Sequence, residues 1–270
     1  MRMLAGLART AHLGPCLAIT VLTVLVGVAS GVDAWTLLGV GIVVLLGQLS
    51  IGWSNDVIDA DRDRAAQRTD KPIAAGEVAP RLVWTAALVS LTVALVSSLL
   101  LGIWFAVAHA VTVAAGWAYN LWLKRSWASG IAFVVSFGLL PSLARLAGDT
   151  PRLATVGETL AAATIGFSVH LANTLPDLDD DVRAGVRGLP HLLGRRGTAA
   201  IGFITLIAGA VVLTVEIGHP VALVGLALVI VIGVWGLVAS LHRATRLVFR
   251  LVVAAALLLA VELVVVSALR

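Results

Sequence analysis

Long runs of apolar side chains dominate the sequence, and short polar segments separate them. The runs cover residues 15–32, 36–54, 83–102, 104–122, 129–147, 155–175, 199–217, 221–241 and 247–268. A helix needs about 20 apolar residues to cross a bilayer, and the alternating segments of a membrane barrel are absent. Because a backbone in lipid must satisfy its own hydrogen bonds, each run is predicted to be a helix. The pattern predicts an all-α, polytopic membrane protein with nine transmembrane helices in a single domain, residues 1–270.

Composition agrees with this fold class. The chain is 60% hydrophobic and 13% charged, whereas soluble domains are about 45–50% apolar and about 25% charged. The pI near 10.2 does not indicate nucleic-acid binding, since Lys and Arg collect in the cytoplasmic loops of membrane proteins. Residues 15–30 lack a cleavage site, so this run is expected to be the first span rather than a signal peptide. The single Cys16 excludes an intrachain disulfide.

The distribution of positive charge predicts the orientation in the cell membrane. If the N-terminus is cytoplasmic, only Arg145, Arg152 and Arg270 of the 19 Lys and Arg residues fall outside. This asymmetry is the one expected for a multi-pass protein. Two long inside loops, about 55–82 and 176–198, then form acidic caps and hold ten of the fifteen Asp and Glu residues. The functional site is predicted in these loops.

One polar pattern occurs twice, each time at the cytoplasmic end of a run. Both copies read N-x3-D-x3-D, the first with Asn55, Asp59 and Asp63 and the second with Asn173, Asp177 and Asp181. A spacing of four places the three side chains on one face of a helix, about 6 Å apart along the axis. The repetition predicts two four-helix pseudo-repeats followed by a ninth helix. Such repeats tend to form a site at their interface.

Two facing acidic stripes are suited to divalent cations. Stacked carboxylates repel one another, and Mg²⁺ is commonly held by one or two carboxylates together with substrate phosphates. The same loops carry bases suited to phosphate oxygens, namely Arg68, Lys71, Lys124, Arg183 and Arg187. Together with the apolar runs, these residues predict a site for an apolar chain that carries a diphosphate.

Three other interpretations of the acids, namely a solvated helix end, a calcium loop and an ion pathway, agree less well with the sequence than a diphosphate site does. An isolated D-x3-D would more often be a solvated helix end, but the repetition disfavours this. A calcium-binding EF-hand requires Gly at its sixth position and Glu at its twelfth; Arg64 and Asp70 stand there in one copy, and Val182 and Gly188 in the other. An ion transporter would place its acids near the bilayer midplane, whereas these acids lie at the membrane edge.

Four segments resemble the motifs of one family, the UbiA superfamily of intramembrane prenyltransferases. They are "NDVIDADRD" (55–63), "RTDKPIAAGEV" (68–78), "YNLWLKRS" (119–126) and "DLDDDVRAGVRGLPHLLG" (177–194). The two Asp-rich segments are the most specific of these. The third resembles a Tyr…Lys element of the family, and in "RTDKP" Lys71 stands where the family usually has Arg. The resemblance covers almost the whole chain.

The resemblance implies a nine-helix bundle whose central cavity is capped by the acidic loops and opens sideways to lipid. It implies Mg²⁺ as the cofactor, with metal ligands Asn55, Asp59, Asp63, Asp177 and Asp181, to which the repeat adds Asn173. It implies that Arg68, Lys71 and Lys124 bind the diphosphate of the substrate. Tyr119 would lie near the C–O bond that breaks. The residues expected to act in catalysis are Asp59, Asp63, Asp177, Asp181, Tyr119 and Lys124.

Several aromatic side chains are candidates for the walls of this cavity. An allylic cation is stabilised by dry walls and π faces, and Trp53 and Trp117 are the preferred candidates because they lie just inside their spans. The other Trp residues are expected to be interfacial anchors. His170 is interpreted as a buried structural residue, with a role as acceptor base as the alternative. His12, His219 and His242 are expected at the membrane interface.

The additional acids of the two loops are predicted to differ in role. Asp56 is favoured as functional, whereas Asp61, Asp179 and Asp180 are expected to be solvated.

The leading hypothesis is Mg²⁺-dependent transfer of an isoprenyl group from a prenyl diphosphate to a lipophilic, aromatic or quinone-precursor acceptor in the membrane. An intramembrane terpene cyclase would use the same ionisation, but the 6% aromatic content and single Tyr argue against it. A non-enzymatic transporter or prenyl-lipid-binding protein would not require such complete metal motifs. No nucleic acid and no obligate protein partner are predicted.

Overall fold

All regular secondary structure in the described residues is helical. The computed structural model describes residues 2–148, 150–183, 185–242 and 245–269, without the side chains of residues 2–4, 180 and 183. The predictions for Asp180 and Arg183 therefore lie outside the described side chains. The helices are α1 (Arg2–Thr10), α2 (Leu13–Ala29), α3 (Ala34–Ile58), α4 (Ala60–Ala65), α5 (Pro80–Ser98), α6 (Ile103–Leu121), α7 (Ile131–Leu146), α8 (Val156–Thr174), α9 (Leu178–Arg183), α10 (Leu189–Ile217), α11 (Ala222–Leu241) and α12 (Thr245–Leu269), with 3-10 turns η1 (Leu99–Leu101) and η2 (Leu123–Arg125).

Each predicted apolar run corresponds to one long helix among the described residues. Five segments are long and apolar enough to cross a membrane, namely α3, α5 with η1, α10, α11 and α12. Helices α2 and α7 are apolar but shorter, and α6 and α8 carry polar residues such as His109 and His170. The fold is therefore that of a multi-pass, all-helical membrane protein, while the count of nine spanning helices stays a prediction.

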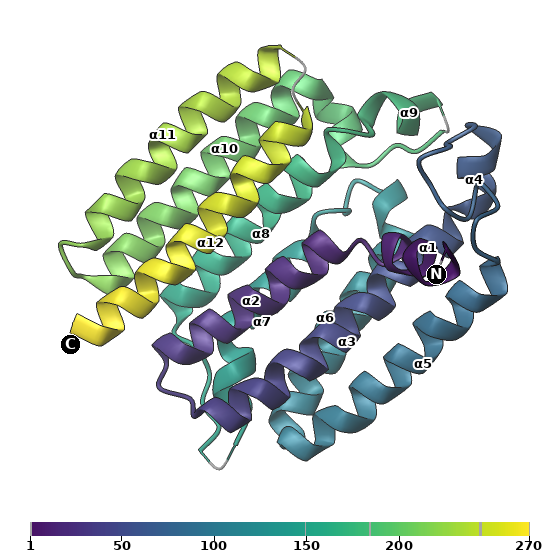
Figure 1. Cartoon of the computed structure of the whole chain (residues 1–270). Coiled ribbons are helices and arrows are strands. Elements are labelled where there is room, and N and C mark those ends of the chain that lie inside the picture. The colour runs from purple at the N-terminus through teal and green to yellow at the C-terminus, as the bar shows by residue number, and fades with distance from the viewer. Residues whose placement is uncertain (1, 149, 184, 243–244, 270) are drawn as a thin grey trace.

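The long helices pack in the same order in both halves of the chain. In the first half α2 packs on α3, α3 on α5, and α5 on α6; in the second, α7 packs on α8, α8 on α10, and α10 on α11. Helix α12 contacts both α11 and α2 and so closes the bundle, as Figure 1 shows. This arrangement leaves α2, α3, α6, α7, α8 and α12 around the interior.

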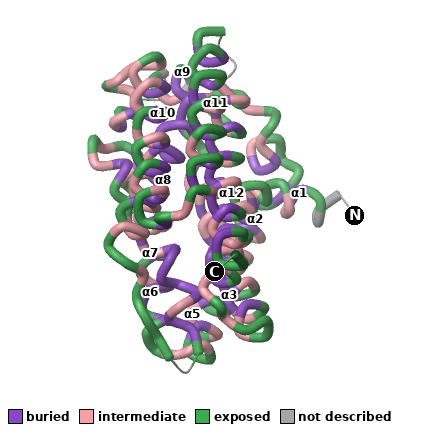
Figure 2. The backbone as a smooth tube through the Cα atoms, turned by 90° about the vertical axis from the view of Figure 1, so that its left-hand side faces the viewer, coloured by how far each residue is buried: buried purple, intermediate pink, exposed green. Residues whose placement is uncertain are grey.

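Apolar side chains cover the outside of the bundle. Exposed examples are Leu88, Val89 and Val96 on α5 and Val231 and Trp235 on α11. Figure 2 shows exposed residues running along the outer helices and buried residues along their inner sides. Because lipid tails are as apolar as these side chains, such a surface is suited to a bilayer.

Both acidic loops start in the same way. A long helix ends, the chain breaks, and a helix of six residues follows. Helix α3 ends at Ile58 and α4 follows after Asp59, while α8 ends at Thr174 and α9 follows after Asp177. The amide of Asp63 donates to the carbonyl of Asp59 at 2.9 Å, and that of Asp181 to Asp177 at 2.8 Å. Helical hydrogen bonding therefore joins the two acids of each stripe, which explains why they share a face.

The two short helices also end alike. Gln67 and Gly185, each four residues after the second acid of its stripe, have positive φ angles of 54° and 76°. In the next residue, the amide of Arg68 donates to the carbonyl of Asp63 at 3.0 Å, and the amide of Val186 donates to the carbonyl of Asp181 at 2.9 Å. The repeat seen in the sequence thus extends to the backbone geometry. One boundary differs from the prediction, because residues 55–58 still belong to α3 rather than to the loop.

Candidate active site

Two cavities meet inside the bundle. The larger, about 530 Å³, lies among α2, α3, α6, α7, α8 and α12, and the smaller, about 100 Å³, lies between the acidic loops. Both are lined by Asn55, Arg68, Lys71, Tyr119, Asn173 and Asp177. The apolar interior and the acidic loops therefore share one junction.

The smaller cavity brings the predicted site residues together. Its walls include all six members of the two stripes and also Arg68, Lys71, Tyr119 and Lys124. They come from α3, α4, α6, η2, α8, α9 and the two acidic loops, up to 126 residues apart in the chain (from 55 to 181). The spacing of each stripe, combined with the packing of the two halves, is sufficient to form this cluster.

Asp59 is a buried acid of the first stripe, as buried as Asp63. Only 4% of the residue is exposed. Lys124 Nζ lies 2.5 Å from Asp59 Oδ1, and Arg62 Nη2 lies 3.0 Å from Asp59 Oδ2. Burial lowers the pKa of Lys124 below its ordinary value, although the carboxylate of Asp59 opposes this. Both oxygens of Asp59 are thus occupied by cationic groups.

Arg62 connects the two stripes and was not predicted as a site residue. Besides Asp59, its guanidinium lies 3.7 Å from Asp63 and 3.3 Å from Asp181. The pKa values of Asp63 and Asp181 lie above the ordinary value because both acids are buried, and the positive charge of Arg62 offsets part of this increase. The sequence signal for Arg62 is its position three residues after Asp59, on the inner side of α4. A cationic group therefore lies between the acids of the two halves.

Oxygen atoms suited to Mg²⁺ surround the guanidinium of Arg62, but they are too far apart to bind one ion together. Within the described part of the chain, no three His, Cys, Asp or Glu side chains are close enough to hold one ion. Carboxylates and amide oxygens are nevertheless the ligands that Mg²⁺ uses, and it completes its shell with substrate phosphates and water. The guanidinium among the carboxylates shows that this donor set accommodates positive charge. The residues therefore fit a magnesium ion that binds together with a phosphorylated substrate.

Arg68 forms the contact between the loops at the second stripe. Its Nε and Nη2 atoms donate to Asp70 at 2.8 and 2.9 Å, and Nη1 donates to Asp177 at 3.2 Å. Hydrogen bonding to Arg68 lowers the pKa of Asp70 to about 2. The guanidinium is thus fixed at the junction of the two cavities, where it can present donors to an anion.

Lys71 contacts an acid that lies outside the stripes. Its Nζ is 2.8 Å from Asp56 Oδ1 and 3.3 Å from His12 Nε2. Asp56 is 2% exposed, and His12 Nε2 lies 2.7 Å from the same oxygen. His12 also lines the larger cavity, and its position at the membrane interface stays a prediction.

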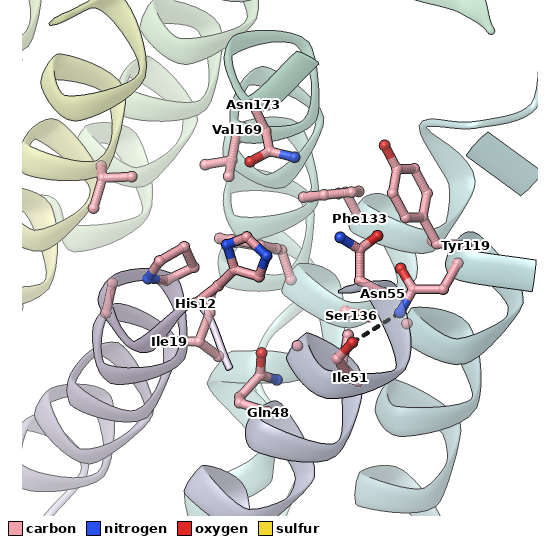
Figure 3. A pocket seen from close by; sticks show the side chains of 18 of the residues that line it. His12, Ile19, Gln48, Ile51, Asn55, Tyr119, Phe133, Ser136, Val169 and Asn173 are labelled. Atoms are coloured by element: carbon pink, nitrogen blue, oxygen red, sulfur yellow. Dashed lines mark hydrogen bonds between the residues drawn. The ribbon is translucent and has the colours of Figure 1, made fainter. Parts of the chain in front are cut away.

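Tyr119 lies at the junction within a group of aromatic rings. Its ring centroid is 5.2 Å from that of Phe133 and 5.8 Å from that of His170, both edge-on. Figure 3 shows Tyr119 and Phe133 side by side, with Asn55 next to them. His170 is fully buried and its Nε2 lies 3.0 Å from Ser129 Oγ, as its structural interpretation requires.

The predicted tryptophan walls were wrong. Trp53 Nε1 donates to the Leu7 carbonyl at 2.9 Å, and Trp117 Nε1 donates to Ser50 Oγ at 3.0 Å. Neither ring is among the described residues that line the two cavities; Phe133 and Phe137 are. A Trp just inside a helix end can face either the cavity or a neighbouring helix, and here its N–H finds a partner between helices.

Asp61 and Asp179 lie away from the cluster. Asp61 has a side chain that is 98% exposed and pairs with Arg64, and Asp179 is 65% exposed and pairs with Arg195. These two side chains are therefore solvated, as predicted.

The sequence is similar to that of known membrane enzymes. A model described as the UbiA prenyltransferase family matches residues 16–258. A digeranylgeranylglyceryl phosphate synthase from Natronomonas pharaonis is 32% identical over 160 residues, which cover 56% of this chain and 56% of that protein. A 1,4-dihydroxy-2-naphthoate octaprenyltransferase from Mycobacterium leprae is 30% identical over 178 residues, which cover 62% of this chain and 60% of that protein. The matches thus span little more than half the length of these curated relatives.

Solved structures show the same fold. An apo UbiA homolog from Aeropyrum pernix K1 has a TM-score of 0.75 and 18% identity, and the match covers 92% of this chain and 97% of that one. A UbiA homolog from Archaeoglobus fulgidus bound to GPP and Mg²⁺ has a TM-score of 0.72 and 15% identity, with coverage of 97% and 99%. At these identities the likeness shows the fold.

Proposed function

Because the chain belongs to the UbiA prenyltransferase family, we propose that it transfers an isoprenyl group from a prenyl diphosphate to a lipophilic, aromatic or quinone-precursor acceptor within the membrane. The observation that carries this proposal is the junction of the two cavities. An acidic cavity with cationic side chains adjoins an apolar cavity of about 530 Å³. A molecule with a diphosphate at one end and an apolar chain at the other fits both.

The diphosphate would bind in the acidic cavity. We assign Asn55, Asp59, Asp63, Asn173, Asp177 and Asp181 as the residues that hold Mg²⁺. When bound, Mg²⁺ would neutralise the negative charge that develops on the leaving diphosphate. Arg68, Lys71 and Lys124, each now paired with a carboxylate, would donate to phosphate oxygens. These groups act at the atoms where charge develops, which is where they lower the barrier.

The allylic carbon would lie at the junction, beside Tyr119. As the C–O bond breaks, positive charge develops on this carbon, and the rings of Tyr119 and Phe133 offer π faces at that point. The buried wall excludes water, which would otherwise capture the cation. The acceptor would enter from the larger cavity, whose wall includes Gln48 and Ser136 as well as apolar residues. The distribution of Lys and Arg further supports acidic loops on the cytoplasmic side of the cell membrane.

The names of similar proteins support this class of reaction. Two relatives are called a digeranylgeranylglyceryl phosphate synthase and a naphthoate octaprenyltransferase. Structures of the Archaeoglobus homolog contain GPP or DMAPP together with Mg²⁺. For the present chain, a prenyl diphosphate and a divalent metal are accordingly proposed as ligands.

Product analysis tests the proposal. Purified protein in lipid nanodiscs is incubated with Mg²⁺ and prenyl diphosphates of several lengths, with and without a lipophilic phenolic acceptor. We expect a prenylated acceptor and an equal amount of diphosphate, and we expect EDTA to abolish both. A cyclic terpene formed without acceptor would instead identify a cyclase. Tight binding of the diphosphate without any turnover would identify a binding protein.

Arg62 is expected to compete with the metal. Replacing Arg62 with Ala removes the guanidinium that lies between the two stripes, so Mg²⁺ or Mn²⁺ no longer has to displace it. We expect the metal Kd, measured by calorimetry with a non-hydrolysable prenyl diphosphate analogue, to fall about tenfold, equivalent to about 1.4 kcal/mol. Arg64→Ala is the matched control, because Arg64 pairs with the exposed Asp61. A weaker or unchanged metal affinity in Arg62→Ala would show that Arg62 supports the site instead.

A further inference from the structure

A histidine on the wall of the larger cavity is paired with a buried aspartate that does not line the cavity. His12 Nε2 lies 2.7 Å from Asp56 Oδ1. The Asp56 side chain is 2% exposed, whereas that of His12 is 38% exposed. Lys71 Nζ donates to the same carboxylate oxygen at 2.8 Å. The family motifs and the two acidic stripes assign no function to His12.

The hydrogen bonds determine which ring nitrogen can accept a proton. A carboxylate only accepts hydrogen bonds, so Nε2 must carry the hydrogen that it shares with Asp56. In the neutral ring, Nδ1 then holds the lone pair. Lys71 Nζ, at 3.3 Å, then lies beside this N–H without donating to it, and within the described residues the polar contacts of the His12 ring involve Nε2 alone. The carboxylate thus orients the ring and would stabilise the imidazolium once Nδ1 is protonated.

The backbone holds His12 in this position by two unusual features. His12 has a φ of 53° and a ψ of 53° and forms the break between α1 and α2. A left-handed conformation is unfavourable for a non-glycine residue. A Cβ on Gly52 of α3 would lie 2.1 Å from the carbonyl oxygen of Ala11, so only glycine permits the link to approach α3. Asp56 is one helical turn further along α3.

The cavity wall places this pair beside the junction. His12 lines the larger cavity with Lys71 and Asn55, which also line the acidic one. Figure 3 shows the imidazole of His12 and the side-chain amides of Gln48 and Asn55 pointing into the same cavity. A polar acceptor group entering from the larger cavity would therefore meet His12 close to the expected position of the allylic carbon.

We propose that His12 is the general base that takes the proton of the acceptor, and that Asp56 is its positioning residue. This inference rests on the proposed function. The acceptor class is a hydroxylated ring, a phenol or an enol, whose hydroxyl is hydrogen-bonded to His12. In the transfer, a bond forms between the acceptor and the allylic carbon. The bond from that carbon to the diphosphate oxygen breaks, and the diphosphate leaves with the electron pair. The acceptor proton moves to Nδ1 of His12 and then to solvent.

Two variants of His12 suit the unusual backbone. Glycine adopts positive φ freely and asparagine does so more readily than other residues, so His12→Gly and His12→Asn are expected to fold. Ionisation is measured without acceptor, as exchange of ¹⁸O in the prenyl diphosphate from the bridging position to the non-bridging positions. Transfer is measured with the phenolic acceptor. His242→Asn is the matched control, because among the described residues the His242 ring is hydrogen-bonded only to the Val238 carbonyl near the end of α11.

The base assignment predicts that the two reactions separate. Loss of a general base typically lowers a rate by about 10²–10⁴-fold, so transfer should fall by at least about 10²-fold in both variants. Isotope exchange should stay within about threefold of the wild type. Added imidazole should fill the space in His12→Gly and restore transfer at least about tenfold, but it should not rescue His12→Asn to the same extent.

Other outcomes overturn the assignment. Unchanged transfer in both variants would exclude His12 as the base. A parallel loss of exchange and transfer would show that His12 acts on the diphosphate through Asp56 and Lys71 rather than on the acceptor. A wild-type protein that catalyses neither reaction with any prenyl diphosphate would contradict the proposed function itself, whatever the variants do.

Discussion

Replacing Asp59 with asparagine should lower the rate of prenyl transfer by about 10³-fold, equivalent to about 4 kcal/mol in activation free energy. Asp59 is the acid whose two oxygens face Lys124 and Arg62, and it is proposed to bind the metal. An amide keeps the shape and offers one neutral oxygen, but it removes the charge that holds the cation. Turnover is measured at saturating prenyl diphosphate over a range of Mg²⁺ concentrations.

The same stretch of sequence contains the control for this experiment. Asp61 is two residues away, but its side chain is 98% exposed and pairs with Arg64. Asp61→Asn removes the same charge from the same loop and should leave turnover within about twofold, since exposed ion pairs contribute little. Equal losses in the two variants would mean that the loop acts through its net charge, and the assignment of Asp59 as a metal ligand would be abandoned.

Replacing Lys124 with methionine should reduce both turnover and stability. Lys124 is 8% exposed, and its ammonium group is the closest cation to Asp59. Methionine keeps the volume but leaves a buried carboxylate with Arg62 as its remaining cation. Removing one partner of a buried pair typically costs about 3–5 kcal/mol. We expect a loss of turnover of about 10²-fold or more and a lower thermal unfolding temperature in detergent.

Two comparisons separate catalysis from folding at this position. Arg125→Met is the matched control, because Arg125 is the exposed neighbour of Lys124 and should tolerate the change. In the double variant Asp59→Asn/Lys124→Met the buried charges are removed together, so the unfolding temperature should recover relative to Lys124→Met. Turnover should not recover. If turnover recovered with stability, Lys124 would have only a structural role.

The acidic cluster could be predicted because its geometry depends on local spacing. A residue every four positions remains on one face wherever the backbone keeps helical hydrogen bonds, and such bonds join Asp59 to Asn55 and Asp63, and Asp181 to Asp177, despite the helix breaks. The repetition of the stripe also indicated which segments should face each other. These two facts require no knowledge of how the helices are rotated.

The residues that could not be identified from the sequence depend on such rotations. Arg62 and Arg64 are equivalent in the sequence, yet one faces the opposite stripe and the other faces Asp61. Trp117 bonds to α3 rather than facing the cavity because of how α6 is turned. His12 reaches α3 only through the left-handed break after α1. Each case is decided by tertiary packing, which a periodic pattern does not contain.

The guanidinium partners of the second stripe have a consequence for biosynthesis. Arg68 pairs with Asp177 and Arg62 pairs with Asp181, and both arginines belong to the first half of the chain. The first half, by contrast, neutralises Asp59 with its own Arg62 and Lys124. During synthesis the N-terminal part of a chain emerges first. The arginines that pair with Asp177 and Asp181 are therefore synthesised before these acids, so the first half already carries the cations against which the acids of the second half dock.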